Sequence, residues 1–152
     1  MAMLARVQQD LAELASDAHV DASAEVVKPI MGGDVVWHCA LSGPSMTPYE
    51  GGVFKLCVRF PEAYPMQPPL LRFATKIFHC NVSPDGWLAL ESLGGGWSPS
   101  TTLSQVLSAV VGLLVQPDPM AASVPEIAAL LHFDRRQHDS MARRCTRRFA
   151  MA

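Results

Sequence analysis

The sequence has no long hydrophobic run, no excess of charge of one sign and no closely spaced pair of cysteines. No apolar run approaches the ~18 residues of a membrane-spanning helix, so we expect no membrane partner. The first residues lead into Gln8, Gln9 and Asp10, which predicts no secretory signal. The formal net charge is −2, which argues against nucleic acid as the main partner but leaves room for a local basic surface.

The four cysteines are Cys39, Cys57, Cys80 and Cys145, and none of them forms a C-x-x-C pair. Three of them lie in apolar or strand-like surroundings. This pattern predicts reduced thiols of a cytoplasmic or nuclear protein and indicates neither a disulfide framework nor a zinc site. We therefore expect no metal and no cofactor.

Hydrophobic residues make up 49% of the 152 residues and charged residues 17%, which is typical of a globular chain. A chain of this length buries roughly two thirds of its unfolded surface, so its core needs no metal or disulfide. No internal repeat, low-complexity tract or linker interrupts it. We therefore expect a single domain over residues 1–152.

Apolar periodicity divides the chain into a first helix, a group of strands and a group of later helices. Apolar residues three and four apart predict the first helix, and alternation from Val53 to Phe60 predicts a strand covered on one face. The expected elements are a helix at about 3–16 with an exit at 17–19, extended runs around 26–27 and 35–37 joined by a turn at 31–34, strands at 53–60 and 70–73, and helices from 103 to a stop at 116, near 123–132 and near 134–149. Strands grouped ahead of helices indicate an α+β fold with a four-stranded antiparallel meander.

The stretch from Lys76 to Pro99 shows no sustained period. It is rich in glycine and holds Trp87 and Trp97. A loop of about two dozen residues inside a compact domain is often functional, so we expect the active or binding region here.

Five separated motifs resemble one family, the ubiquitin-conjugating enzymes (E2), and most closely its small D-type class. The motifs are Gly43-Pro44 with residues 47–54 (TPYEGGVF), residues 60–69 (FPEAYPMQPP), residues 75–82 (TKIFHCNV), Trp97-Ser98-Pro99 and residues 124–128 (VPEIA). The resemblance runs from about residue 3 to 151. It implies the E2 (UBC) fold with a long active-site loop. It also implies ubiquitin or a ubiquitin-like protein, an E1 and a RING or U-box E3 as partners.

The chain departs from this family at the position of the nucleophile. By resemblance, Ala89 in Gly86-Trp87-Leu88-Ala89 occupies the place of the catalytic cysteine. Thioester chemistry requires a thiolate, which a methyl group cannot supply. Ala121 likewise stands where close relatives carry a lysine-orienting aspartate, Cys80 where they carry proline and Glu91 where they carry aspartate.

Three residues of the loop have competing interpretations. Asn81 is by resemblance an oxyanion donor, a role worth ~3–4 kcal/mol where intact, or a residue that only holds the loop. We favour the second role, because Ala89 lets no tetrahedral intermediate form nearby. Cys80 is better explained as a small hydrophobe than as a displaced nucleophile. No second histidine, cysteine or carboxylate stands at metal-ligand spacing beside His79. This residue is therefore better explained as organising the loop than as a base or metal ligand.

Two surfaces are implied by the resemblance. One would meet E3 ligases and consists of Arg6, Pro65, Met66, Trp97, Ser98 and Pro99. Its aromatic and thioether side chains are either interface anchors or loop packing, and both interpretations stay open. Ser23 matches a sheet position where some relatives bind a second ubiquitin.

The last predicted helix holds six of the 12 basic residues, at 135, 136, 143, 144, 147 and 148. Cations near a helix C-terminus are favourable, which explains them as a solvated face. An acidic partner is the sharper alternative. We prefer the first explanation, although the excess of arginine is more than solvation requires.

Two explanations of Ala89 compete. The chain is either a natural E2-like protein without catalysis that binds E3 or ubiquitin, or an active E2 in which the cysteine was replaced by design. The further changes at Cys80 and Ala121 favour the natural variant modestly, because neither is needed to abolish thioester formation.

Overall fold

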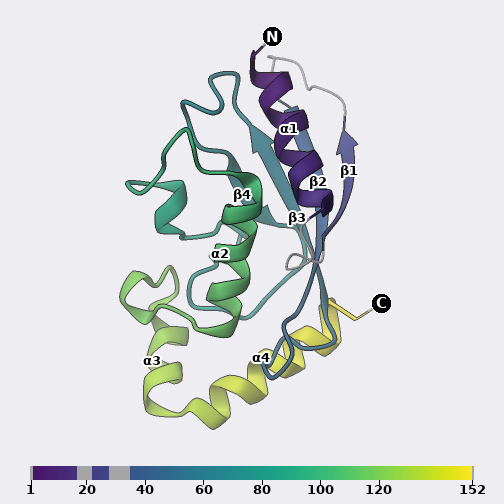
Figure 1. The fold of residues 1–152 in the computed structure, drawn as a ribbon. Coiled ribbons are helices and arrows are strands. Elements are labelled where there is room, and N and C mark those ends of the chain that lie inside the picture. The colour runs from purple at the N-terminus through teal and green to yellow at the C-terminus, as the bar shows by residue number, and fades with distance from the viewer. Residues whose placement is uncertain (1, 17–21, 28–34, 152) are drawn as a thin grey trace.

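The computed structural model describes residues 2–16, 22–27 and 35–151 (Figure 1). Its helices are α1 (Ala2–Ser16), α2 (Leu103–Val115), α3 (Pro125–Phe133) and α4 (Arg135–Phe149), and its strands are β1 (Ala22–Val27), β2 (Val35–Ser42), β3 (Val53–Phe60) and β4 (Leu70–Phe73). Two short 3-10 helices, η1 (Glu91–Leu93) and η2 (Pro119–Ala121), were not predicted. The predicted helix exit at 17–19 and the turn at 31–34 lie outside the described residues.

The strands form one antiparallel sheet in the order β1-β2-β3-β4. Along β3, Phe54, Leu56, Val58 and Phe60 are buried, while the residues between them face outward. Trp37 of β2 pairs with Val58 and is also fully buried. The period-two alternation predicted for this strand is therefore confirmed.

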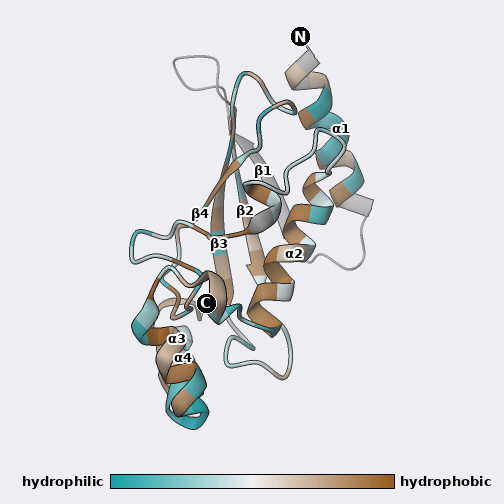
Figure 2. Ribbon diagram, turned by 90° about the vertical axis from the view of Figure 1, so that its left-hand side faces the viewer, coloured by the Kyte–Doolittle hydropathy of each residue, from teal (hydrophilic) through white to brown (hydrophobic). Residues whose placement is uncertain are grey.

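Helices α1 and α2 cover one face of the sheet (Figures 1 and 2). Val7 and Leu14 of α1 and Val106, Leu107 and Val110 of α2 are buried in the core between helices and sheet. Val7 and Leu14 are two turns apart, and Val110 lies one turn after Val106 and Leu107, so one stripe of each helix is removed from water. The core lies between these two helices and the sheet.

Helices α3 and α4 extend from one end of the sheet (Figure 1). Asp134 ends α3 and caps α4, since its carboxylate accepts a hydrogen bond from the Gln137 N–H at 3.1 Å. The far end of α4 returns to the sheet, where the Val53 N–H donates to the Ala150 carbonyl at 2.9 Å. The two C-terminal helices thus meet at Asp134, and the end of α4 is hydrogen-bonded to the start of β3.

The α+β class, the N-terminal helix, the antiparallel sheet and the C-terminal helices are confirmed. Thr102 caps α2 in a capping box with Gln105. Helix α3 begins two residues later than predicted, because Pro125 occupies its first turn. Within the described ranges, no helix is long and apolar enough to cross a membrane.

Candidate functional site

The long loop turns sharply at Ser83–Gly86 and docks on the edge of β4. The Phe73 N–H donates to the Gly86 carbonyl at 2.8 Å, and backbone bridges pair Arg72 with Trp87 and Val82 with Leu88. Gly86 has φ 94°, and a Cβ on it would lie 2.2 Å from the Phe73 carbonyl oxygen. Only glycine fits this close approach.

His79 is fully buried at the start of this loop. Its Nδ1 accepts a hydrogen bond from the Asn81 N–H at 3.0 Å, and its Nε2 lies 2.8 Å from the Leu113 carbonyl of α2. This pairing requires a neutral ring with its proton on Nε2. Burial lowers the pKa of His79 to about 4, which keeps the ring neutral at physiological pH.

Asn81 is fully buried and ties the loop to the segment around η2. Its Nδ2 donates to the carbonyls of Asp118 at 2.8 Å and Ala121 at 3.2 Å. Its Oδ1 accepts from the Asp118 N–H at 2.9 Å. Both amide hydrogens are therefore used inside the protein, and neither is free to stabilise charge on another molecule.

Ala89 is held beside Asn81 by a hydrogen bond from its N–H to the Asn81 carbonyl at 2.8 Å, and its side chain is half-buried. Ala121 is exposed in η2 and contributes only its backbone to Asn81. The structure thus gathers His79, Asn81, Ala89 and Ala121 in one place, which we call the loop cluster. None of these four residues carries a thiol or a carboxylate, and both ring nitrogens of His79 are paired with backbone groups.

Cys80 lies between two members of the cluster but is fully buried. Its thiol donates to Asn81 Oδ1 at 3.4 Å, and burial raises its pKa. Its carbonyl accepts hydrogen bonds from the backbone N–H groups of Ser123 and Val124. A protonated, buried thiol is a poor nucleophile.

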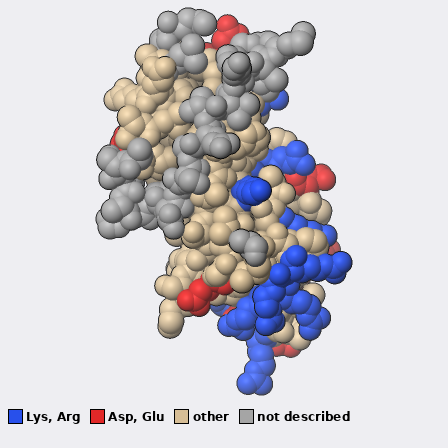
Figure 3. Space-filling model, turned by 90° about the vertical axis from the view of Figure 1, so that its right-hand side faces the viewer, with Lys and Arg blue, Asp and Glu red and all other residues tan. Residues whose placement is uncertain are grey.

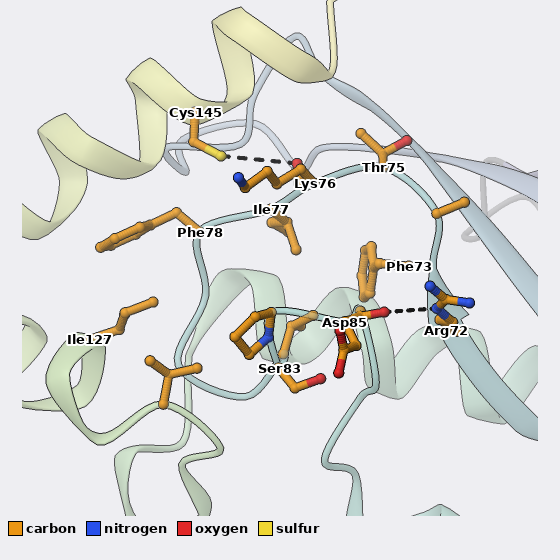
Figure 4. Close-up of a pocket in the computed structure, with 15 residues that line it drawn as sticks. Arg72, Phe73, Thr75, Lys76, Ile77, Phe78, Ser83, Asp85, Ile127 and Cys145 are labelled. Carbon is orange, nitrogen blue, oxygen red and sulfur yellow. Dashed lines mark hydrogen bonds between the residues drawn. The ribbon is translucent and has the colours of Figure 1, made fainter.

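A pocket of about 450 Å³ opens on the other side of the loop, toward α3 and α4 (Figure 4). Apolar side chains form most of its wall, among them Phe73, Ile77, Phe78 and Ile127. Cys145 reaches its rim from α4, where the thiol lies 4.0 Å from the Lys76 carbonyl and burial raises its pKa. Ala89 and Asn81 are not among the lining residues, so the pocket and the loop cluster are separate features.

The residues of the expected E3-binding surface come together from three parts of the chain. The Arg6 guanidinium donates to the carbonyls of Pro99 at 2.6 Å and Thr101 at 2.8 Å. The Trp97 indole N–H donates to the Pro65 carbonyl at 3.0 Å. Met66 beside it is 73% exposed, and Ser98 completes the same loop.

Trp97 and Met66 differ in their burial. Trp97 is half-buried, with its ring 6.0 Å from that of Tyr64, whereas Met66 extends into solvent. Trp97 therefore holds the two loops together, whereas Met66 presents an apolar side chain to solvent.

One predicted residue, Ser23, and one contact that was not predicted lie outside the loop cluster. Ser23 lies on the edge strand β1, paired with Ala40, and is separate from the loop cluster. The buried contact between the Tyr64 hydroxyl and the Asp10 carboxylate was not predicted. Asp10 also pairs with Arg6 at 3.2 Å, so it helps to fix a residue of the expected E3-binding surface.

A comparison with protein-family models finds a match to the family described as ubiquitin-conjugating enzyme. The match covers residues 6–146, which includes the sheet, the long loop and all but the ends of the first and last helices.

Proposed function

This chain belongs to the ubiquitin-conjugating enzyme family, and we propose that it acts as a binding protein of the ubiquitin pathway, close to the D-type class, that forms no thioester. It would engage a RING or U-box E3 and compete there with active enzymes of the same family. Ubiquitin or a ubiquitin-like protein and the E1 are the other partners expected of it. The proposal treats residues 1–152 as one UBC domain in the cytoplasm or nucleus.

The observation that carries the proposal is the methyl group of Ala89. Thioester transfer needs a thiolate at that place to attack the E1 thioester, form a new carbon–sulfur bond and later leave. Cys80 offers no substitute, because it is fully buried and its pKa is raised by burial. Cys145 lines a separate pocket, and burial raises the pKa of its thiol as well.

The side chains around Ala89 support a structural role for the loop. His79 and Asn81 place all their hydrogen-bonding groups on the backbone of neighbouring segments. This network holds the loop and the η2 segment in one arrangement without any catalytic partner. A loop held in one conformation can be recognised by a partner protein even when it catalyses no reaction.

Binding of an E3 is supported by the surface around Met66. A side chain that is 73% exposed can bury apolar area worth ~1.5–3 kcal/mol on docking. The loops beside it are fixed in advance by the Arg6 and Trp97 hydrogen bonds, which reduces the entropy lost on binding.

A competition assay tests the proposal. Increasing amounts of the chain are added to an active D-type E2, its E3, E1, ATP and ubiquitin, and chain formation is followed by gel. We expect inhibition that the Met66→Ala variant relieves. Equal inhibition by both proteins, or none by either, would count against E3 competition.

The alternative, an active enzyme whose cysteine was replaced by design, is supported by the same intact loop. The hydrogen bond from the Ala89 N–H to the Asn81 carbonyl places residue 89 in an ordered backbone. Restoring a cysteine there tests this alternative directly.

A further inference from the structure

Helix α4 carries five exposed arginines on one side: Arg136, Arg143, Arg144, Arg147 and Arg148. We call this set the arginine face. In Figure 3 the basic side chains gather at the lower end of the molecule, where Figure 1 places α4. Among the helices of the described residues, no other has such a concentration of charge of one sign.

The arginines share a side because of helical spacing. Arg143 and Arg147 are one turn apart, as are Arg144 and Arg148, and Arg136 lies two turns before Arg143. The opposite side of the helix is buried through His138, Ala142 and Thr146. The face therefore points away from the protein along the length of the helix.

Among the described residues, hardly any acid neutralises these charges. Asp139 is the only acidic residue in α4, and its carboxylate pairs with Arg135 at 3.1 Å, outside the arginine face. In the part of the chain that the structure describes, Arg136, Arg143, Arg144 and Arg147 have no ion pair or hydrogen bond from their side chains. The Arg148 guanidinium lies 5.1 Å from the Phe149 ring centroid.

The rest of the chain has the opposite charge. Helix α4 holds six arginines and one aspartate, whereas the remaining sequence holds the other six basic residues and thirteen of the fourteen acidic ones. The overall charge of −2 hides this separation. Solvation alone accounts for single cations near a helix C-terminus, but it does not account for a separation of charge on this scale, which favours a partner of complementary charge.

We propose that the arginine face binds an acidic segment, rich in aspartate and glutamate, of a partner protein. Guanidinium groups bind carboxylates through paired N–H donors, which lysine cannot do. From Arg136 to Arg148 the face is about 18 Å long. An extended segment of about six residues spans that length.

A short segment fits this surface better than a membrane or a long nucleic acid. Exposed charges act over about 8–10 Å at physiological salt. A flat anionic bilayer or a long polyanion would extend past the helix and meet the net negative remainder of the molecule. An acidic segment confined to the helix avoids that repulsion, and it leaves the loop cluster and the Met66 surface open.

The test measures binding of a fluorescein-labelled oligoglutamate of about eight residues by fluorescence anisotropy, at low and at raised salt. The main variant is Arg143→Gln with Arg147→Gln. Its matched control is Lys55→Gln with Arg59→Gln, which removes the same charge from the exposed side of β3. All four positions are exposed, and circular dichroism and thermal melting are to be recorded for each variant to check that it is folded.

We expect the α4 variant to bind about five-fold more weakly than the parent, and the control to bind like the parent. Binding of the parent should also weaken as salt rises. Equal loss in both variants would show a response to net charge alone and overturn the proposal. Stronger binding of the parent to anionic phospholipid vesicles or to a short oligonucleotide than to the peptide would overturn it as well.

Discussion

Replacing Asn81 by alanine separates a structural from a catalytic role for this side chain. The amide makes three hydrogen bonds to backbone groups, with the Asp118 carbonyl, the Asp118 N–H and the Ala121 carbonyl. Each such bond contributes about 1 kcal/mol net, so Asn81→Ala should lower the free energy of unfolding by about 3 kcal/mol. For a chain of this size, that loss lowers the melting temperature by roughly 6–12 °C.

Two further variants sharpen the measurement. Asn81→Asp keeps an oxygen for the Asp118 N–H but places a second oxygen against two carbonyls, so its loss at neutral pH should be at least as large. Acidification should recover part of that loss, since a protonated carboxyl donates one hydrogen bond. Gln67→Ala removes an exposed amide and should change stability by less than about 0.5 kcal/mol.

The assay is thermal unfolding followed by circular dichroism, with urea unfolding as a second measure. If the Asn81→Ala variant had the same melting temperature as the parent, the structural role of Asn81 would be refuted. In that case the three hydrogen bonds would contribute nothing to stability, and an oxyanion role would become the better explanation of the residue.

The remaining predictions concern chemistry, binding and pH. Ala89→Cys should permit loading by E1 in a non-reducing gel, and adding Ala121→Asp should accelerate discharge to free lysine, since general-base help is worth up to ~10²–10⁴ in rate; equal discharge by both proteins would remove Ala121 from the argument. Met66→Ala should weaken binding to a RING or U-box domain by about 1 kcal/mol or more, measured by calorimetry, and an unchanged affinity would exclude Met66 as an anchor. Burial lowers the pKa of His79 from 6.5 to about 4, so the folded state binds a proton less readily than the unfolded chain. The free energy of unfolding should be full above pH 6.5 and fall by up to about 3 kcal/mol as the pH drops toward 4; His79→Gln should flatten this dependence and the exposed His132→Gln should not, and matching slopes in all three proteins would contradict the assignment.

Most of the fold could be predicted from the local spacing of apolar residues. Alternation in β3 and the three-and-four spacing in α1 and α2 are properties of neighbouring residues, so they could be read directly. The two 3-10 helices could not, because a single turn has too few residues to establish a period. Helix α3 was shifted by two residues for a similar reason, since its start depends on Pro125 and not on apolar spacing.

The site was predictable only where a motif marked it. Asn81 and Ala89 follow from the motifs that resemble the family, but the partners of Asn81 lie about 40 residues away in the η2 segment. The pocket beside the loop joins residues from 72 to 145 and has no local signature. The contact between Tyr64 and Asp10 spans 54 residues, and no spacing rule links such a pair.

Whether this chain lacks E2 catalysis is tested most directly by thioester formation with the protein as it stands. The protein is incubated with E1, ATP and ubiquitin and analysed on a non-reducing gel, with Ala89→Cys as the positive control. We predict no adduct of the parent, because Ala89 has no thiol and Cys80 is buried. A ubiquitin adduct of the parent that dithiothreitol removes would contradict the account, and loss of that adduct in Cys80→Ser would identify Cys80 as the nucleophile.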